Sequence, residues 1–287
     1  MDVSTAMIRL LLIILYIVSC IRLWVAPWKY FQLNSPFFNE QRDIFSKLDM
    51  DQRIPEQWRL HQFLDIGNDE PQSYPVFVKP EWGQNSRGIT RADDIQALTD
   101  IRLNRGDTKL NYLIQEAAPG KREFEIFIIP STNSDNAPAV VSVTETINNS
   151  GEDYPVNGIY NPSTGYKDIS NEFSGEQMLT LWQHLKPIGS FRISRFGIRA
   201  NSIDALLAGK FHIIEVNLFL PMPLVLLCDS QRWETTLKFC VNTMWHLAKI
   251  TKNIPPSQIH KPVFFKKLKH AKSLKLTTKL RSNNEHA

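Results

Sequence analysis

Residues 74–89 read YPVFVKPEWGQNSRGI, and this stretch decides which fold we expect for the whole chain. The apolar run from Val76 to Val78 predicts a short buried strand with Lys79 at its end. Glycines at positions 83 and 88 bound a loop of small polar residues. A lysine beside such a loop suits a polyphosphate, because its ammonium meets the anion while small residues let backbone N–H groups approach closely. An exposed strand end before an ordinary loop has the same composition, so the interpretation depends on the other motifs.

Length and composition limit the class of protein. A chain of 287 residues with 43% hydrophobic residues suits one large domain or two closely packed subdomains. The three cysteines, Cys20, Cys228 and Cys240, have neither paired nor metal-like spacing. The sequence therefore supports no disulfide framework and no zinc site, and it favours a reducing compartment.

The net charge of +4 is unevenly distributed. Residues 261–281 hold eight Lys or Arg residues and no acid, so the rest of the chain carries a net charge of −4. With Phe264 and Phe265, this basic tail could bind anionic lipid, although a solvated tail has the same composition. No module that reads nucleic-acid bases accompanies it, and we expect no specific nucleic-acid partner.

The N-terminal segment is apolar. Leu10 to Ile21 contains no charge, and apolar residues resume after Arg22. Trp24 and Trp28 suit the headgroup region of a membrane. We expect a single-pass anchor in the inner membrane, with the body in the cytoplasm because the positive charges after the segment outnumber those before it. A cleaved signal, a lipoprotein box at residues 17–20 and a buried core helix are the alternatives.

Hydrophobic periodicity predicts the order of the elements. Strands are expected near residues 112–116, 123–129, 139–145 and 211–217. Helices are expected after caps at Thr90 and Ser174, and from about residue 231 to 252 with Trp233 buried. A helix near 57–64 and a long loop at 146–172 complete the prediction. The expected divisions are an anchor at 1–27, a membrane-proximal connection at 28–72, the main domain at 73–253 and the basic tail at 254–287.

Four features then stand in order along the chain. They are Lys79 with its loop, Gln115-Glu116 before a turn, Glu123 at the start of a strand, and Glu215-x-Asn217 on another strand. This order resembles the ATP-grasp superfamily over residues 38–230. The resemblance implies an α+β fold in which two α+β subdomains grip ATP between them. The chain is also similar to membrane-attached bacterial proteins related to D-alanine–D-alanine ligase, which share the N-terminal apolar segment and a stretch like residues 35–38.

The resemblance implies a nucleotide site. Lys79 would hold the α- and β-phosphates of ATP, and Glu123 would accept hydrogen bonds from the ribose hydroxyls. The remaining positions come from the loop that closes over the phosphates and from the hinge that meets the adenine: Gly83, Ser86, Gly88, Gln115, Glu116 and Ala117.

The resemblance also implies Mg²⁺ as a cofactor, held by Glu215 and Asn217. The family has an aspartate as a further ligand where this chain has Gly197, and Asp204 is a possible substitute. Arg195 would steady the acyl phosphate, with Arg199 as a second catalytic candidate; surface solvation or a structural ion pair is the alternative for both.

Two other departures concern the substrate. The family has a lysine where this chain has Gln41-Arg42, and its small Gly-rich loop is replaced by the apolar residues 218–223. The leading hypothesis is a membrane-anchored ATP-dependent carboxylate–amine (or thiol) ligase that acts on a small-molecule or peptide carboxylate. The alternatives are a catalytically weakened nucleotide-binding scaffold or sensor, and a membrane-surface protein that acts through its basic tail.

Overall fold

The computed structural model describes residues 3–83, 86–105, 110–228 and 232–258, together with residues 263, 266 and 269. Most of the predicted basic tail, from residue 259 onward, lies outside the described residues.

A small antiparallel sheet carries the stretch with Lys79. Its four strands lie in the order β1-β4-β2-β3, with bounds β1 (Gln62–Leu64), β2 (Val76–Pro80), β3 (Thr90–Ala92) and β4 (Tyr112–Glu116). The helix α3 (Ile95–Arg105) packs on it through Leu98 and Ile101, which are buried with Val76, Val78 and Ile114. β1 comes from the segment predicted to be a connection and pairs with β4.

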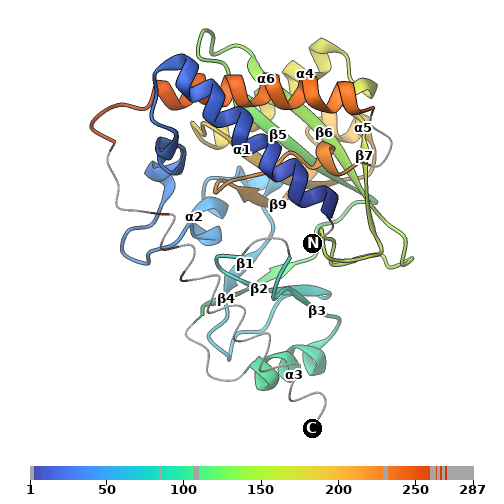
Figure 1. Ribbon diagram of the computed structural model, residues 1–287. Helices are drawn as coiled ribbons and strands as arrows, with labels where there is room; N and C mark the ends of the chain where they lie inside the picture. Colours follow the sequence, from blue (N-terminus) through green and yellow to red (C-terminus); the bar gives the residue numbers. More distant parts are fainter. Residues whose placement is uncertain are drawn as a thin grey trace.

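A larger antiparallel sheet forms the other half of the molecule. Its order is β7-β6-β5-β8-β9, with bounds β5 (Arg122–Pro130), β6 (Pro138–Asn148), β7 (Thr164–Asp168), β8 (Ser194–Ala200) and β9 (Phe211–Asn217). Figure 1 shows the small sheet and α3 together at one end of the molecule, with the larger sheet beyond them. The predicted α+β class with two α+β subdomains is confirmed.

The alternation of β5 explains how the larger sheet serves both a core and a site. Phe124, Ile126 and Ile128 point to one face and share a core with the helix α4 (Gly175–Leu185). Glu123 and Glu125 point to the other face, because successive side chains alternate. Further along that face Phe127 and Ile129 pack with α6 (Trp233–Lys252). Only the polar end of this face is therefore left for the small sheet.

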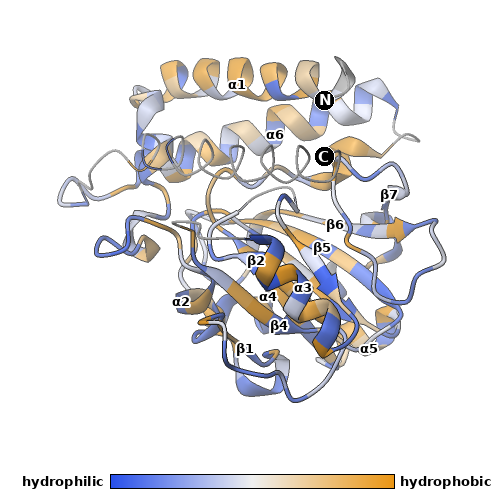
Figure 2. Cartoon of the chain, turned by 90° about the horizontal axis from the view of Figure 1, so that it is seen from below, coloured by the Kyte–Doolittle hydropathy of each residue, from blue (hydrophilic) through white to orange (hydrophobic). Residues whose placement is uncertain are grey.

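The N-terminal apolar segment forms α1 (Val3–Leu23), which lies beside α6 in both views of the molecule (Figures 1 and 2). Cys20 is fully buried in the interface between the two helices, and the Tyr16 hydroxyl bonds to Oγ1 of Thr251 at 3.1 Å. Among the described residues, one segment, Thr5–Leu23, is long and apolar enough to cross a membrane. Only 17% of it is buried, and its outer face is strongly hydrophobic (Figure 2).

Short elements connect these parts. They are the 3₁₀ helices η1 (Pro27–Gln32), η2 (Ser35–Phe37), η3 (Glu56–Trp58), η4 (Ser170–Glu172), η5 (Lys186–Ile188) and η6 (Leu224–Leu227), and the helices α2 (Lys47–Asp51) and α5 (Ile203–Leu207). The predicted loop at 146–172 is too long, because β7 lies within it. The predicted helix near 57–64 is also wrong, since η3 and the edge strand β1 occupy that stretch.

Candidate functional site

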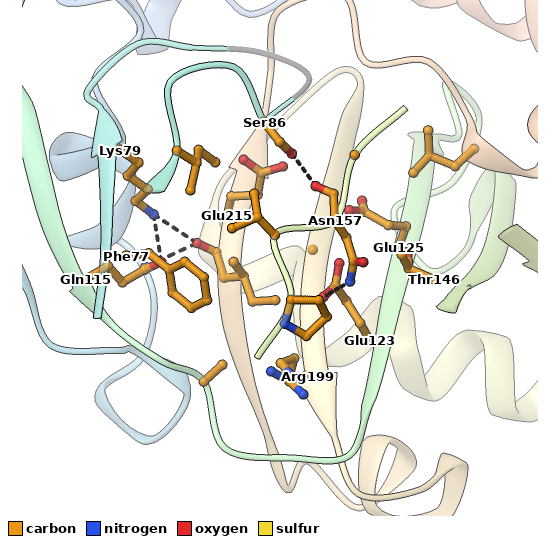
Figure 3. A pocket seen from close by; sticks show the side chains of 18 of the residues that line it. Phe77, Lys79, Ser86, Gln115, Glu123, Glu125, Thr146, Asn157, Arg199 and Glu215 are labelled. Atoms are coloured by element: carbon orange, nitrogen blue, oxygen red, sulfur yellow. Dashed lines mark hydrogen bonds between the residues drawn. The ribbon is translucent and has the colours of Figure 1, made fainter. Parts of the chain in front are cut away.

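A cavity lies between the two sheets and contains about 970 Å³ of empty space, counting the part that is open to solvent. Both sheets line it, and Figure 3 shows Lys79 on one side with Glu123 and Glu125 on the other. The predicted site residues that line it are Lys79, Ser86, Gln115, Glu116, Glu123, Arg195, Arg199 and Glu215. Those that do not line it are Gly83, Gly88, Ala117 and Asn217.

Lys79 is 4% exposed at the end of β2. Its Nζ donates to Oε1 of Gln115 at 2.7 Å and to the carbonyl of Ile214 at 3.4 Å. Burial lowers the pKa of Lys79 to about 7; the nearby Lys47 adds to this shift and Glu215 opposes it. Asp51 and Glu215 act on Lys79 electrostatically, but no ion pair joins this lysine to a carboxylate among the described residues. Lys79 is therefore suited to an anion that enters the cavity.

An irregularity in the larger sheet prepares the Ile214 carbonyl for this contact. The pairing between β8 and β9 shifts between Gly197 and Ile198, whose partners are Glu215 and Ile213. Ile214 is the extra residue of this bulge, and its carbonyl accepts hydrogen bonds from the small sheet instead of from β8. The bulge thus joins the two sheets at the lysine.

The predicted adenine-binding hinge is partly occupied by internal contacts. Gln115 is buried, and its Nε2 donates to the Ile214 carbonyl at 3.2 Å. The amide of Ala117 donates to the carbonyl of Pro75, which leaves it no free donor. Glu116 lines the cavity and lies 3.6 Å from Nδ1 of His61. Ala118, which the sequence did not single out, lines the cavity in place of Ala117.

The loop after Lys79 meets the long loop that follows β6. Oγ of Ser86 donates to the carbonyl of Asn157, and Nδ2 of Asn157 donates to Oε2 of Glu123 at 2.9 Å (Figure 3). Gly88 has a φ of 75°, which lets the backbone turn back toward β3. Asn157 therefore closes the cavity by contacting both sides, a role that the sequence did not reveal.

Glu123 and Arg199 lie opposite each other on β5 and β8. Burial raises the pKa of Glu123, and the hydrogen bond from Asn157 and the charge of Arg199 oppose this shift. Arg199 donates to the carbonyl of Asp153 at 2.8 Å and stacks on Tyr154, with its guanidinium carbon 5.0 Å from the ring centroid. Asp153 and Tyr154 belong to the loop between β6 and β7, residues 149–163, which we call the covering loop. Arg199 holds this loop in place, which favours a structural role for its side chain.

No protein-family model and no curated protein matches this chain. Solved structures do: the L-amino acid ligase from Bacillus licheniformis shares 16% identity and a TM-score of 0.46, over 76% of this chain and 50% of that chain. The VanG D-Ala:D-Ser ligase from Enterococcus faecalis shares 16% identity and a TM-score of 0.44, over 72% and 61% of the two chains. The D-alanine–D-alanine ligase from Bacillus anthracis complexed with ATP shares 12% identity and a TM-score of 0.44, over 72% and 64%.

These three proteins are ligases, and the chain spans between half and about two thirds of their length, at low identity. These similarities assign neither a substrate nor a residue role to this chain. Any such role has to come from the geometry of the site.

The acidic side of the main cavity centres on Glu215. Burial alone would raise its pKa, but Lys47, Arg195 and a hydrogen bond from Asn217 outweigh burial and lower it. Nδ2 of Asn217 donates to Oε1 of Glu215 at 2.6 Å, while Asn217 itself lines a smaller adjoining cavity with Lys47 and Gly83. Glu215 is therefore ionised and faces the main cavity.

Lys47 is a second cation that the sequence did not single out. It opens α2, donates to the carbonyl of Pro80 at 2.9 Å and stabilises the charge of Glu215. Arg42, the residue considered upstream, instead forms an ion pair with the buried Glu81. Only the three-dimensional contact with β9 distinguishes Lys47 from an ordinary helix-start residue.

Arg195 and Glu125 form the other charged pair. Nε of Arg195 lies 2.9 Å from Oε2 of Glu125, and Nη1 donates to the carbonyl of Met222 at 3.2 Å. The latter contact ties the apolar loop at 218–223 to the site. Burial raises the pKa of Glu125 to about 7, with Arg195 opposing this shift. Glu125 was missed because it lies between apolar residues of a regularly alternating strand.

The donors available to Mg²⁺ are fewer than the resemblance implies. Gly197 contributes no side-chain oxygen, and Asp204 lies exposed on α5 and does not line the cavity, so the suggested substitution by Asp204 is wrong. Within the described ranges, no group of three or more His, Cys, Asp or Glu residues could hold a metal ion. The ionised Glu215 still fits Mg²⁺, which takes one or two protein carboxylates and completes its shell with phosphates and water.

Proposed function

We propose that this chain is a membrane-attached, ATP-dependent carboxylate–amine (or thiol) ligase. The observation that carries the proposal is one cavity in which the buried Lys79 of the small sheet faces Glu123 and Glu215 of the larger sheet. A cation on one wall and carboxylates on the other suit a nucleotide with a phosphate end and a sugar end.

The residues of the site would divide the work of binding ATP. Lys79 would pair with the phosphates, and the loop that carries Ser86 would cover them. Glu123 would accept the ribose hydroxyls after the Asn157 amide has moved aside. Mg²⁺, when bound, would neutralise phosphate charge.

The reaction itself would consist of two displacements. A carboxylate oxygen of the substrate attacks the γ-phosphorus of ATP, the bond to the β-phosphate oxygen breaks, and ADP leaves. The amine or thiol then attacks the acyl carbon, loses a proton and displaces inorganic phosphate. Arg195, held by Glu125 and by the Met222 carbonyl, would stabilise the negative charge that develops on the acyl phosphate.

The experiment that tests this proposal is ATP turnover by the purified full chain over a panel of carboxylates, each with and without an amine or a thiol. We expect release of ADP that depends on the carboxylate, with phosphate release that depends on the nucleophile. Lys79→Met should abolish both. ADP release that does not depend on any carboxylate in a broad panel would contradict the proposed ligase activity.

A second candidate function is a nucleotide-binding scaffold or sensor with weakened turnover. Gly197 favours it, because a glycine supplies no metal ligand. Tight ATP binding without carboxylate-dependent turnover is the outcome that selects it.

We further infer that α1 attaches the chain to the cytoplasmic face of the inner membrane by lying in its surface. One side of the helix is held on α6 by the buried Tyr16 and Cys20. The opposite side exposes Met7, Leu10, Ile13, Ile14, Ile17, Val18 and Ile21. Trp24 follows the helix and is 94% exposed, which suits the headgroup region. Spanning the bilayer would require α1 to leave α6.

A further inference from the structure

Three residues on adjacent strands form one row across the acidic side of the cavity. Glu125 of β5 pairs with Gly197 of β8, and Gly197 pairs with Glu215 of β9. Residues directly opposite each other in an antiparallel sheet point to the same face, so the two glutamates flank the glycine on the cavity side.

The two glutamate side chains converge over Gly197. A Cβ built on Gly197 would lie 3.3 Å from Oε1 of Glu125 and 3.3 Å from Cγ of Glu215. Both distances are tighter than ordinary van der Waals contact, so the space that a side chain at 197 would use is already taken. A side chain at position 197 and the Glu125 carboxylate would therefore compete for the same space, and a side chain at 197 would displace the carboxylate.

The two oxygens of Glu125 have different surroundings. Oε2 faces Nε of Arg195 at 2.9 Å, whereas Oε1 is the atom nearest Gly197. Arg195 lies farther from Glu215, with Nη2 3.8 Å from Oε1. One arginine thus serves two converging carboxylates, an arrangement that a divalent cation on the side of Oε1 would balance.

The hydroxyls beside this row provide a second, independent observation. Thr146, which pairs with Glu123 two positions along from the row, is 7% exposed and lines the cavity, and its Oγ1 has no hydrogen-bond partner among the described residues. Thr144, which pairs with Glu125, is buried, and its Oγ1 also has no hydrogen-bond partner among the described residues. Buried hydroxyls of this kind call for water or an ion, and the water shell of a divalent cation would supply the partners.

We propose that Glu125 supplies the carboxylate that position 197 lacks, and that Glu125 and Glu215 together hold a divalent cation over Gly197. The inference rests on the proposed function for the phosphates that would complete the shell. Two carboxylates are sufficient, because Mg²⁺ commonly uses one or two of them together with substrate phosphates and water.

The test measures binding of Mn²⁺ to the full-length chain in detergent, by loss of the free-ion signal in electron paramagnetic resonance, with and without a non-hydrolysable ATP analogue. Glu125→Gln and Glu215→Gln should each weaken Mn²⁺ binding at least tenfold. Asp204→Asn is the control, since this carboxylate is exposed on α5 and does not line the cavity. It should change Mn²⁺ affinity less than threefold.

A rescue experiment separates a ligand role from a structural one. Gly197→Asp alone should lower the affinity for Mn²⁺, because Glu125 occupies the space. Combining Gly197→Asp with Glu125→Ala should restore the affinity to within threefold of wild type, as the new carboxylate takes the vacated place. Thermal melting of each variant verifies that it is folded.

The outcomes are distinct. Loss of Mn²⁺ binding in Glu215→Gln but not in Glu125→Gln overturns the inference, as does a wild type that binds no Mn²⁺. Binding of the ATP analogue in EDTA is measured separately. A wild type that binds Mn²⁺ through Glu125 but binds no nucleotide contradicts the proposed function and leaves the cation site standing.

Discussion

Lys79 and Gln115 lie on neighbouring strands of the small sheet, and both donate hydrogen bonds to the carbonyl oxygen of Ile214 in the larger sheet. The two contacts, 3.4 Å and 3.2 Å long, join the halves of the molecule where a bulge frees that carbonyl. The position of the lysine is thereby fixed by both sheets. A nucleotide bound between the sheets would meet an amine that is already in place, which reduces the ordering that binding requires.

The first prediction concerns this lysine. Lys79→Met should weaken binding of ATP roughly ten- to hundredfold, since a hydrogen bond to a charged group contributes about 1.5–3 kcal/mol. Titration with a fluorescent ATP analogue measures the effect. Lys121→Met, at an exposed lysine in the turn before β5, is the control and should bind as wild type does. Equal affinities of the two variants would exclude Lys79 from the phosphate site.

The second prediction is proton uptake when the nucleotide binds. Burial lowers the pKa of Lys79 to about 7, so at pH 8 the side chain of the free protein is mostly neutral. Phosphate charge favours the ammonium form and raises that pKa, so a proton should be taken up at pH 8 and almost none at pH 6, where the lysine is already charged.

Calorimetry of metal-free analogue binding in buffers with different ionisation enthalpies measures this uptake. Glu125 has a pKa raised to about 7 and would also gain a proton near phosphate, so the comparison is made in the Glu125→Gln background. In that background, Lys79→Met should remove the uptake. Uptake that is equal at both pH values, or that survives in the double variant, would contradict the prediction.

The third prediction concerns the covering loop. Asn157 contacts Ser86 through its backbone carbonyl and Glu123 through its side chain. Asn157→Ala should speed nucleotide association roughly two- to tenfold, because a hydrogen bond contributes about 0.5–1.5 kcal/mol and the bond to Glu123 links the loop to β5. The other two bonds of this side chain, with Asn148 and Thr164, lie on the loop's own side of the cavity. Stopped-flow fluorescence gives the rate. Asn161→Ala, which removes a bond within the same loop, is the control and should affect the rate less.

The sequence was most informative where one face of a strand is buried. The strands with Lys79, Gln115, Glu123 and Glu215 were found where alternation or an apolar run predicts them. The cap predicted at Ser174 is also confirmed, and Gln177 completes a capping box with it. These signals are local, because each depends on residues within one element.

The failures depend on partners that are distant in the sequence. The helix predicted from a cap at Thr90 begins instead at Ile95. Thr90 lies in β3, where it pairs with Val78 of β2, and the side chain that accepts from the first turn of the helix is Asp94, bonded to the amide of Ala97. Trp233 was expected in the core of α6 but is 63% exposed. Glu125 escaped notice because its importance comes from the strand register that places it beside Gly197.

The fourth prediction concerns α1. Deleting residues 1–24 would expose the face of α6 that buries Cys240 and the adjoining Val225 and Leu226 of η6. We expect the shortened chain to aggregate, or to melt at a lower temperature in detergent, because an apolar face of the body is uncovered. A helix that spans the bilayer apart from the body would be removable without this loss.

Topology provides a complementary measurement. A cysteine introduced at Thr5 should react with a membrane-impermeant maleimide in inside-out vesicles and be protected in right-side-out vesicles, if α1 lies on the cytoplasmic surface. The native cysteines are all buried and give a low background. The reverse pattern would indicate a helix that crosses the membrane.

The last prediction compares two glycines with positive φ. Gly120, between β4 and β5, has a φ of 126°, and a Cβ there would lie 3.0 Å from the backbone N and C of Ala200 in β8. Gly151, in the covering loop, has a φ of 78° and no atom within 4 Å of such a Cβ. Both alanine variants carry backbone strain, but only Gly120→Ala adds a clash with another strand.

We therefore expect Gly151→Ala to lower the free energy of unfolding by about 1–2 kcal/mol, the cost of the left-handed conformation. Gly120→Ala should cost about 1–3 kcal/mol more, because backbone cannot yield as a flexible side chain does. Denaturant titration in detergent measures both. Because Gly120 lies in the turn that joins the small sheet to the larger one, its variant should also weaken nucleotide binding, whereas equal costs for the two variants would show that the close approach to Ala200 does not hold the sheets together.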